Sequence, residues 1–105
     1  MNIKRIKLLC ENNRLRWTIH IISRLIQRNI SIADVKSAIL HGKIIEEYPH
    51  DYPYPSCLIL GITLQNEYLH IVCGVANDEL WLITAYRPST TEWDSNFTHR
   101  KEQQK

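Results

Sequence analysis

The hydrophobic pattern of this chain changes its period once, at Gly42, and this change limits the folds that the chain can adopt. Before Gly42, apolar residues recur every three or four positions, which is the spacing of amphipathic helices. After Gly42, apolar and polar residues alternate, which is the spacing of strands with one buried face. Helices followed by a run of strands predict an α+β domain with an antiparallel sheet.

The first half of the chain predicts three helices, over residues 2–12, 18–28 and about 31–40. The third begins at Ser31-Ile32-Ala33-Asp34, which resembles a capping box. Gly42 fits its C-terminal end.

The second half predicts four strands, and Pro88 ends the last of them. We therefore expect N-terminal helices packed on one face of a four-stranded, mainly antiparallel sheet. The expected strands cover residues 43–48, 57–64, 67–76 and 80–87. At 105 residues the chain is expected to form one domain, divided into helices (1–42), sheet (43–88) and a C-terminal tail (89–105).

The two faces of the expected sheet depend on its hairpin connections. We take Gln65-Asn66 as a two-residue turn and residues 77–79 as a three-residue connection. His70 then lies between Gly61 and Tyr86, and a glycine beside a strand histidine leaves room for a ligand. A slip by one residue would move every side chain to the other face. The opposite, apolar face is expected to carry Leu58, Leu60, Ile62, Leu64, Leu69, Ile71, Cys73, Val75, Trp81, Ile83 and Ala85.

Three side chains at i, i+4 and i+8 form a stripe on the second helix: His20, Arg24 and Arg28. An imidazole beside two guanidiniums suits a phosphodiester, because it joins proton transfer at neutral pH to fixed positive charge. The alternative is an amphipathic helix with a solvated basic face. The apolar residues expected to anchor this helix on its opposite side are Ile19, Ile22, Leu25 and Ile26.

The charge of the chain is distributed unevenly. Residues 1–30 carry seven basic side chains and one acidic side chain, whereas residues 31–99 carry three basic and nine acidic ones. A basic end on a domain of net charge +2 favours contact with a polyanion or an acidic partner.

Several further residues have two interpretations. His70 is either a structural strand histidine or a catalyst, and Tyr86 is either a half-buried aromatic or a ligand of phosphate. Glu46 is either a general base or part of a solvated edge strand. The tyrosines of the loop, Tyr48, Tyr52 and Tyr54, either stack on bases or pack over the sheet edge.

The tail has two aromatic residues, Trp93 and Phe97, that we expect to dock it onto the domain. Arg100 and Lys101 then either reach the same site or remain disordered.

Other features exclude some classes of protein. The cysteines Cys10, Cys57 and Cys73 are odd in number and lie among apolar residues, so we expect reduced core thiols in a cytoplasmic protein. No set of residues has the spacing of a metal site, and no cofactor motif is present, so we expect neither metal nor cofactor. The chain has no apolar run of about 20 residues, so we expect no membrane segment.

Six segments of the chain, over roughly residues 15–100, carry a resemblance to a known family. They are Trp17-Thr18-Ile19-His20 with Arg24 and Arg28, Ile45-Glu46-Glu47-Tyr48-Pro49, Asp51-Tyr52-Pro53-Tyr54-Pro55-Ser56, Leu60-Gly61, Leu69-His70-Ile71-Val72, and Ile83-Thr84-Ala85-Tyr86-Arg87-Pro88. Together they resemble a bacterial family known as domain of unknown function 4258. The family is similar to the RelE/BrnT-like toxins, small ribonucleases whose barnase-like fold packs helices on a curved antiparallel sheet. This resemblance implies a cognate antitoxin, which in this family is often of a zinc-finger type.

The resemblance implies the toxin of a type II toxin–antitoxin system. Together with the stripe on the second helix and the strand histidine, it predicts a metal-independent endoribonuclease that acts on free or ribosome-bound RNA. The substrate 2′-hydroxyl attacks the adjacent phosphate, with His20 and His70 as base and acid. Tyr86 orients the phosphate or the leaving group. The alternative is a non-catalytic module that binds RNA or a protein, as a monomer or a homodimer; it does not require the two histidines to converge. The expected substrate-binding residues are Arg24, Arg28, Tyr48, Arg100 and Lys101.

Overall fold

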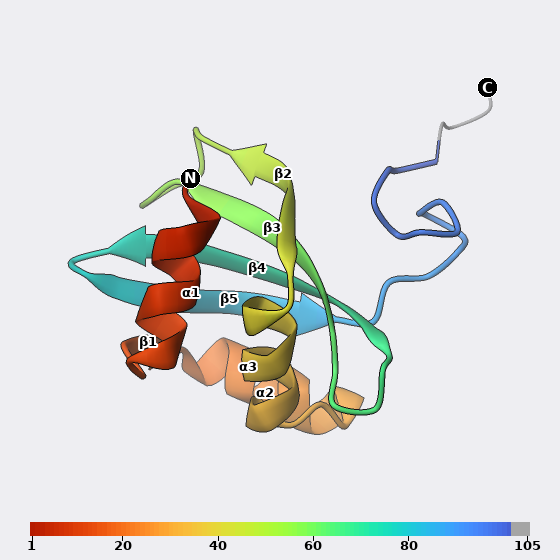
Figure 1. The fold of residues 1–105 in the computed structure, drawn as a ribbon, viewed down its shortest axis with the longest axis horizontal. Coiled ribbons are helices and arrows are strands. Elements are labelled where there is room, and N and C mark those ends of the chain that lie inside the picture. The colour runs from red at the N-terminus through yellow and green to blue at the C-terminus, as the bar shows by residue number, and fades with distance from the viewer. Residues whose placement is uncertain (102–105) are drawn as a thin grey trace.

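The computed structural model describes residues 1–101 and shows three helices over one face of a five-stranded sheet (Figure 1). The helices are α1 (Ile3–Glu11), α2 (Ile19–Arg28) and α3 (Ile32–Leu40). The strands are β1 (Leu15–Trp17), β2 (Lys43–Tyr48), β3 (Ser56–Ile62), β4 (Tyr68–Ala76) and β5 (Glu79–Tyr86), in the spatial order β1-β5-β4-β3-β2. The predicted α+β architecture is confirmed. No helix in the described part of the chain is long and apolar enough to cross a membrane.

Side-chain caps explain where the helices begin. The Thr18 hydroxyl accepts a hydrogen bond from the Ile21 amide at 3.2 Å and starts α2. Ser31 and Asp34 form the predicted capping box of α3. Helix α2 ends at Asn29, whose left-handed backbone (φ 54°) closes the last turn.

The sheet has one strand more than the sequence predicted. The short strand β1 pairs in parallel with Leu80–Leu82 of β5, so the sheet is mixed. Asn13, with a φ of 56°, turns the chain from α1 into β1. A three-residue strand is too short to show an alternating pattern, which is why it escaped sequence analysis.

The β3–β4 hairpin has a different register from the one predicted. Leu60, not Gly61, pairs with His70, and residues 63–67 form a longer connection in place of the two-residue turn. The Thr63 hydroxyl organises this connection by accepting hydrogen bonds from the amides of Gln65 and Glu67. The slip exchanges the two faces of β3, so Ile59 faces the helices and Leu60 faces away from them.

The β4–β5 hairpin turns through two residues, Asn77 and Asp78, whose φ angles are 54° and 57°. Positive φ at both positions is typical of a type I′ turn. This turn is one residue shorter than predicted, so Trp81 pairs with Gly74 and lies on the face of the sheet that points away from the helices. A β-bulge after Val72 then restores the predicted pairing of His70 with Tyr86.

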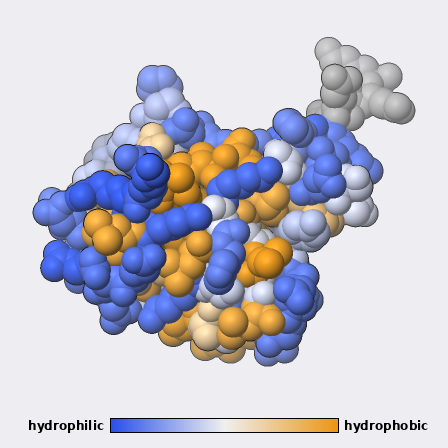
Figure 2. Space-filling view, in the orientation of Figure 1, coloured by the Kyte–Doolittle hydropathy of each residue, from blue (hydrophilic) through white to orange (hydrophobic). Residues whose placement is uncertain are grey.

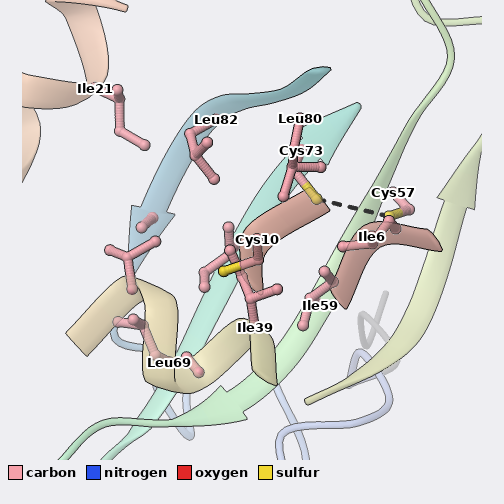
Figure 3. Packing of buried hydrophobic residues seen from close by; sticks show 14 of the residues in the cluster. Ile6, Cys10, Ile21, Ile39, Cys57, Ile59, Leu69, Cys73, Leu80 and Leu82 are labelled. Carbon is pink, nitrogen blue, oxygen red and sulfur yellow. Dashed lines mark hydrogen bonds between the residues drawn. The ribbon is translucent and has the colours of Figure 1, made fainter. Parts of the chain in front are cut away.

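The core lies between the helices and the inward face of the sheet (Figure 3). Each fully buried isoleucine or leucine contributes about 1.5–3 kcal/mol to folding. The three cysteines are free and buried, as predicted, and the Sγ atoms of Cys57 and Cys73 lie 4.0 Å apart on paired strands. The residues labelled in the figure are Ile6, Cys10, Ile21, Ile39, Cys57, Ile59, Leu69, Cys73, Leu80 and Leu82.

Gly61 allows α3 to approach the sheet. A Cβ atom on Gly61 would lie 1.9 Å from the Ala38 carbonyl oxygen, so only glycine fits beneath this helix. The expected role of Gly61, to leave room for a ligand beside His70, is therefore wrong.

The side of α2 that faces the sheet also differs from the prediction. Ile21 and Leu25 anchor the helix, whereas Ile19 and Ile26 are 91% and 76% exposed. Figure 2 shows hydrophobic surface at the edge of the molecule where α2 lies. The predicted anchor was thus correct for Leu25 and for Ile22, which packs partly buried against the core, and wrong for the two exposed isoleucines.

Candidate active site

His70 and Tyr86 lie side by side on the face of the sheet that points away from the helices. The His70 side chain is fully buried, with its Nδ1 3.3 Å from the Tyr86 hydroxyl and its Nε2 2.8 Å from the Phe97 carbonyl oxygen. Because a carbonyl only accepts, Nε2 carries the proton. In the neutral imidazole, Nδ1 therefore accepts a hydrogen bond from the Tyr86 hydroxyl.

Burial sets the protonation states of this pair. It lowers the pKa of His70 below its ordinary value, although the hydrogen bond to the Phe97 carbonyl acts in the opposite direction. Burial also raises the pKa of the Tyr86 phenol. At neutral pH the pair is therefore a phenol hydrogen-bonded to a neutral imidazole, whose Nδ1 lone pair faces the phenol proton.

The C-terminal segment, residues 88–101, covers this pair. Trp93 is 2% exposed and its ring meets the His70 ring edge-on, with a centroid distance of 4.4 Å. Phe97 packs on Tyr68 at 5.1 Å. The prediction that Trp93 and Phe97 dock the tail onto the domain is confirmed, and His70 is thereby enclosed.

Glu46 joins this segment to the edge strand β2. Two nitrogens of Arg100 lie 3.0 and 3.1 Å from its carboxylate oxygens, and the Tyr48 hydroxyl donates to it at 2.6 Å. Burial acts to raise the pKa of Glu46, but the hydrogen bonds from Arg100 and Tyr48 outweigh it and lower that pKa. Burial and the bond to Glu46 raise the pKa of Tyr48 to about 12. Glu46 is therefore a half-buried, ion-paired carboxylate and not part of a solvated edge.

Arg28 approaches the same site from α2. Its Nη1 donates to the Ala85 carbonyl oxygen at 2.8 Å and lies 3.5 Å from the Thr84 hydroxyl. Ala85 precedes Tyr86 in β5, so the guanidinium lies beside this end of the strand. The charges of Arg100 and, more weakly, Arg28 act to lower the pKa of the Tyr86 phenol. Arg87 in turn donates to the carbonyls of Arg28 and Asn29, which ties the end of α2 to β5. The structure thus brings a guanidinium to the phenol–imidazole pair.

The structure does not bring the other predicted residues to this cluster. His20 is exposed and makes no hydrogen bond or ring contact with the described residues, and it lies two helical turns, about 12 Å along the axis, from Arg28. Arg24 is exposed and bonds only its neighbour Gln27, at 3.3 Å, within the described part. Lys101 is exposed, and its backbone bonds Glu92. The pairing of His20 with His70 as base and acid therefore has no support in the geometry.

The model of one family, described as domain of unknown function (DUF4258), matches residues 17–87. The chain belongs to the DUF4258 family. The match confirms the resemblance drawn from the sequence, and its description states no activity. No curated protein and no solved structure matches this chain.

The matched part of this DUF4258 domain includes the four residues Arg28, Glu46, His70 and Tyr86. Trp93 and Arg100, which enclose the site, follow the matched part. Sequence reasoning missed the Phe97 carbonyl as a partner of His70 and the pairing of Glu46 with Arg100. It also missed the outward position of Trp81, which was detectable, because the dipeptide Asn77-Asp78 between two strands is a signal for a tight turn.

Burial of a neutral His70 makes the stability of this DUF4258 domain depend on pH. Because its pKa is lowered in the folded state, the unfolded chain binds a proton at this residue more readily than the folded chain does. We therefore expect the free energy of unfolding to fall as the pH drops below the ordinary histidine pKa of 6.5. Urea unfolding at about pH 7.5 and pH 5.5 measures this, and the His70→Gln variant is expected to show a smaller difference. An equal pH dependence in both proteins would contradict the assignment.

Proposed function

We propose that this domain is a metal-independent endoribonuclease of the toxin type. The observation that carries the proposal is the Tyr86–His70 pair with Arg28 beside it. Tyr86 takes the proton of the RNA 2′-hydroxyl while its own proton passes to Nδ1 of His70. The 2′ oxygen then bonds to phosphorus, the bond from phosphorus to the 5′ oxygen breaks, and that oxygen takes a proton from water. The hydroxide left behind takes the Tyr86 proton, and His70 returns its extra proton to Tyr86. The products end in a 2′,3′-cyclic phosphate and a 5′-hydroxyl.

The phenol, not the imidazole, meets the substrate in this mechanism. Tyr86 is half-buried, whereas His70 is fully buried, so His70 acts through Tyr86 as a positioning residue that accepts its proton. Arg28 stabilises the charge that develops on the phosphate, because only its Nη1 is engaged by the strand. The exposed Arg24 extends the positive surface along α2.

Cleavage of a labelled single-stranded RNA in EDTA tests this proposal. We expect the purified protein to cut the RNA and leave cyclic-phosphate ends. If cleavage requires added ribosomes, the substrate is ribosome-bound RNA and the proposed mechanism is unchanged. Absence of cleavage with and without ribosomes would overturn the proposal.

His20 offers a sharp comparison within the same assay. Because it lies outside the cluster, we expect His20→Ala to cleave RNA within about tenfold of the parent rate, with the loss confined to RNA binding. A loss of cleavage rate of about a hundredfold or more, as expected for a general base, would show that His20 takes part in the reaction.

The enclosure of His70 favours a second candidate function, a non-catalytic module that binds RNA. Both ring nitrogens of His70 already have protein partners, and Trp93 covers the ring. Such a module needs only the basic N-terminal third of the chain. Salt-dependent retention of RNA without any cleavage would support it.

The toxin interpretation includes a protein partner, the cognate antitoxin. The exposed Ile19 and Ile26 give α2 an apolar flank next to its basic one, which suits a protein partner with an amphipathic segment. Co-expression with the neighbouring gene and purification through one tagged chain tests this, and recovery of the tagged chain alone would contradict it.

A further inference from the structure

A concave region lies on the same face of the sheet as Tyr86 and His70, towards the other end of the strands. It has a volume of about 440 Å³ and an almost entirely apolar lining. The lining comes from the start of α2, the loop before β3, and strands β4 and β5. The residues are Thr18, Pro53, Tyr54, Gly74, Trp81 and Ile83.

Two aromatic rings and a guanidinium give this hollow its chemistry. The Tyr54 and Trp81 rings lie 6.4 Å apart at 38°, and the Arg16 guanidinium lies 5.1 Å from the centre of the Trp81 ring. Tyr54 is 43% exposed and Ile83 is 40% exposed, so the hollow opens to solvent. Flat aromatic surface beside a fixed positive charge is what an unpaired nucleotide requires, because its base stacks while its phosphate is neutralised.

The hollow and the candidate active site lie on the same two strands, β4 and β5. Trp81 pairs with Gly74, and Tyr86 pairs with His70, on the same two strands and the same face. Gly74 and His70 are four residues apart on β4, which corresponds to about 13 Å along a strand. A single strand of RNA that crosses this face can therefore contact both places through neighbouring nucleotides.

We propose that this hollow is a nucleobase subsite, in which Trp81 and Tyr54 hold an unpaired base of the RNA strand whose phosphate lies at Tyr86. The proposal rests on the proposed ribonuclease function and adds the way in which the strand is held. Charge favours RNA over an apolar peptide as the occupant, because residues 1–30, which include Arg16, carry seven basic side chains against one acidic one.

Binding of short RNA to a chemically silenced protein tests the subsite. The background is Tyr86→Phe in EDTA, and the probes are a fluorescein-labelled single-stranded RNA and a base-free phosphodiester chain of the same length. We expect Trp81→Leu and Tyr54→Ala each to weaken RNA binding about tenfold, since loss of one base–aromatic stack has about this effect. Neither change should alter binding of the base-free chain.

Two further variants act as controls. Tyr54→Phe keeps the ring and should bind as the background protein does. Tyr52→Ala removes a loop tyrosine that is 96% exposed and does not line the hollow, and it should leave binding unchanged. Thermal unfolding of each variant shows whether Trp81→Leu still folds, and Tyr54→Ala, which changes a loop residue, tests the proposal without that concern.

The outcomes separate the subsite from the enzyme. RNA binding that is unaffected by both Trp81→Leu and Tyr54→Ala overturns the subsite, even if the parent protein cleaves RNA. An equal loss with the base-free chain, or a loss confined to Tyr52→Ala, also overturns it. A base-dependent loss in a protein that never cleaves RNA supports the subsite and overturns only the ribonuclease proposal. Binding of an apolar peptide that competes with RNA more strongly than the base-free chain would show that the hollow is a protein site.

Discussion

Tyr86→Phe is expected to reduce the single-turnover rate of RNA cleavage by about a hundredfold or more. The substitution removes one oxygen atom, which is the atom that links the substrate to Nδ1 of His70. The phenyl ring keeps its packing against the imidazole, so the fold and the affinity for RNA should change little. The measurement is cleavage of a labelled RNA in EDTA with the protein in excess.

Tyr68→Phe is the matched control for this experiment. Tyr68 stands on the same strand and face as His70, and its ring packs on Phe97, but its hydroxyl has no hydrogen-bond partner in the described part of the chain. We expect it to cleave RNA at the parent rate. Equal activity of Tyr86→Phe and Tyr68→Phe would remove the phenol–imidazole pair from the mechanism.

Gly61→Ala is expected to lower the free energy of unfolding by on the order of 3 kcal/mol, at the upper end of the usual cost of overpacking. The added methyl group would lie 1.9 Å from the carbonyl oxygen of Ala38 and 2.5 Å from its carbonyl carbon. Both are backbone atoms of α3, so the whole helix must shift away from β3. Urea unfolding measures the change.

Gly74→Ala gives the comparison. Its added Cβ would meet the Pro55 carbonyl oxygen at 2.7 Å, which belongs to a loop and not to a packed helix. We expect a clearly smaller loss of stability than at Gly61, because a loop adjusts at lower cost than a helix in the core. Equal stability of Gly61→Ala and the parent protein would show that α3 is not in close contact with the sheet.

The helices were predictable because local signals determine them. The Ser31–Asp34 capping box and the apolar spacing of α2 act within a few residues, and no helix end in the structure differs from the predicted one by more than one residue. The short strand β1 gave no such signal, because its position depends on pairing with a strand more than sixty residues later.

The pairing of His70 with Tyr86 in the candidate site was predicted correctly only because two errors in the predicted strand register cancelled each other. The turn at Asn77-Asp78 is one residue shorter than expected, but the bulge after Val72 adds the residue back, so His70 does oppose Tyr86. No compensation occurs in β3, and Gly61 therefore lies on the wrong face for the predicted role. A period of two makes each single-residue error decisive for which side chains meet.

The arrangement of charge around Glu46 was beyond sequence analysis for a different reason. Its partner Arg100 is more than fifty residues away and reaches it only because Trp93 docks the tail. Neither residue type, taken alone, distinguishes an ion pair from two solvated charges.

The contact of Arg28 with β5 also affects whether copies of the chain associate through that strand. Strand β1 covers β5 only at Leu80–Leu82, so the outer edge of β5 beyond this point has no neighbouring strand in the described part of the chain. The Arg28 guanidinium occupies one carbonyl of that edge, at Ala85. Exposed strand edges recruit further strands, and charged side chains placed across them prevent this. A substitution of Arg28 would therefore open a template for aggregation, and light scattering should accompany any assay of such a variant.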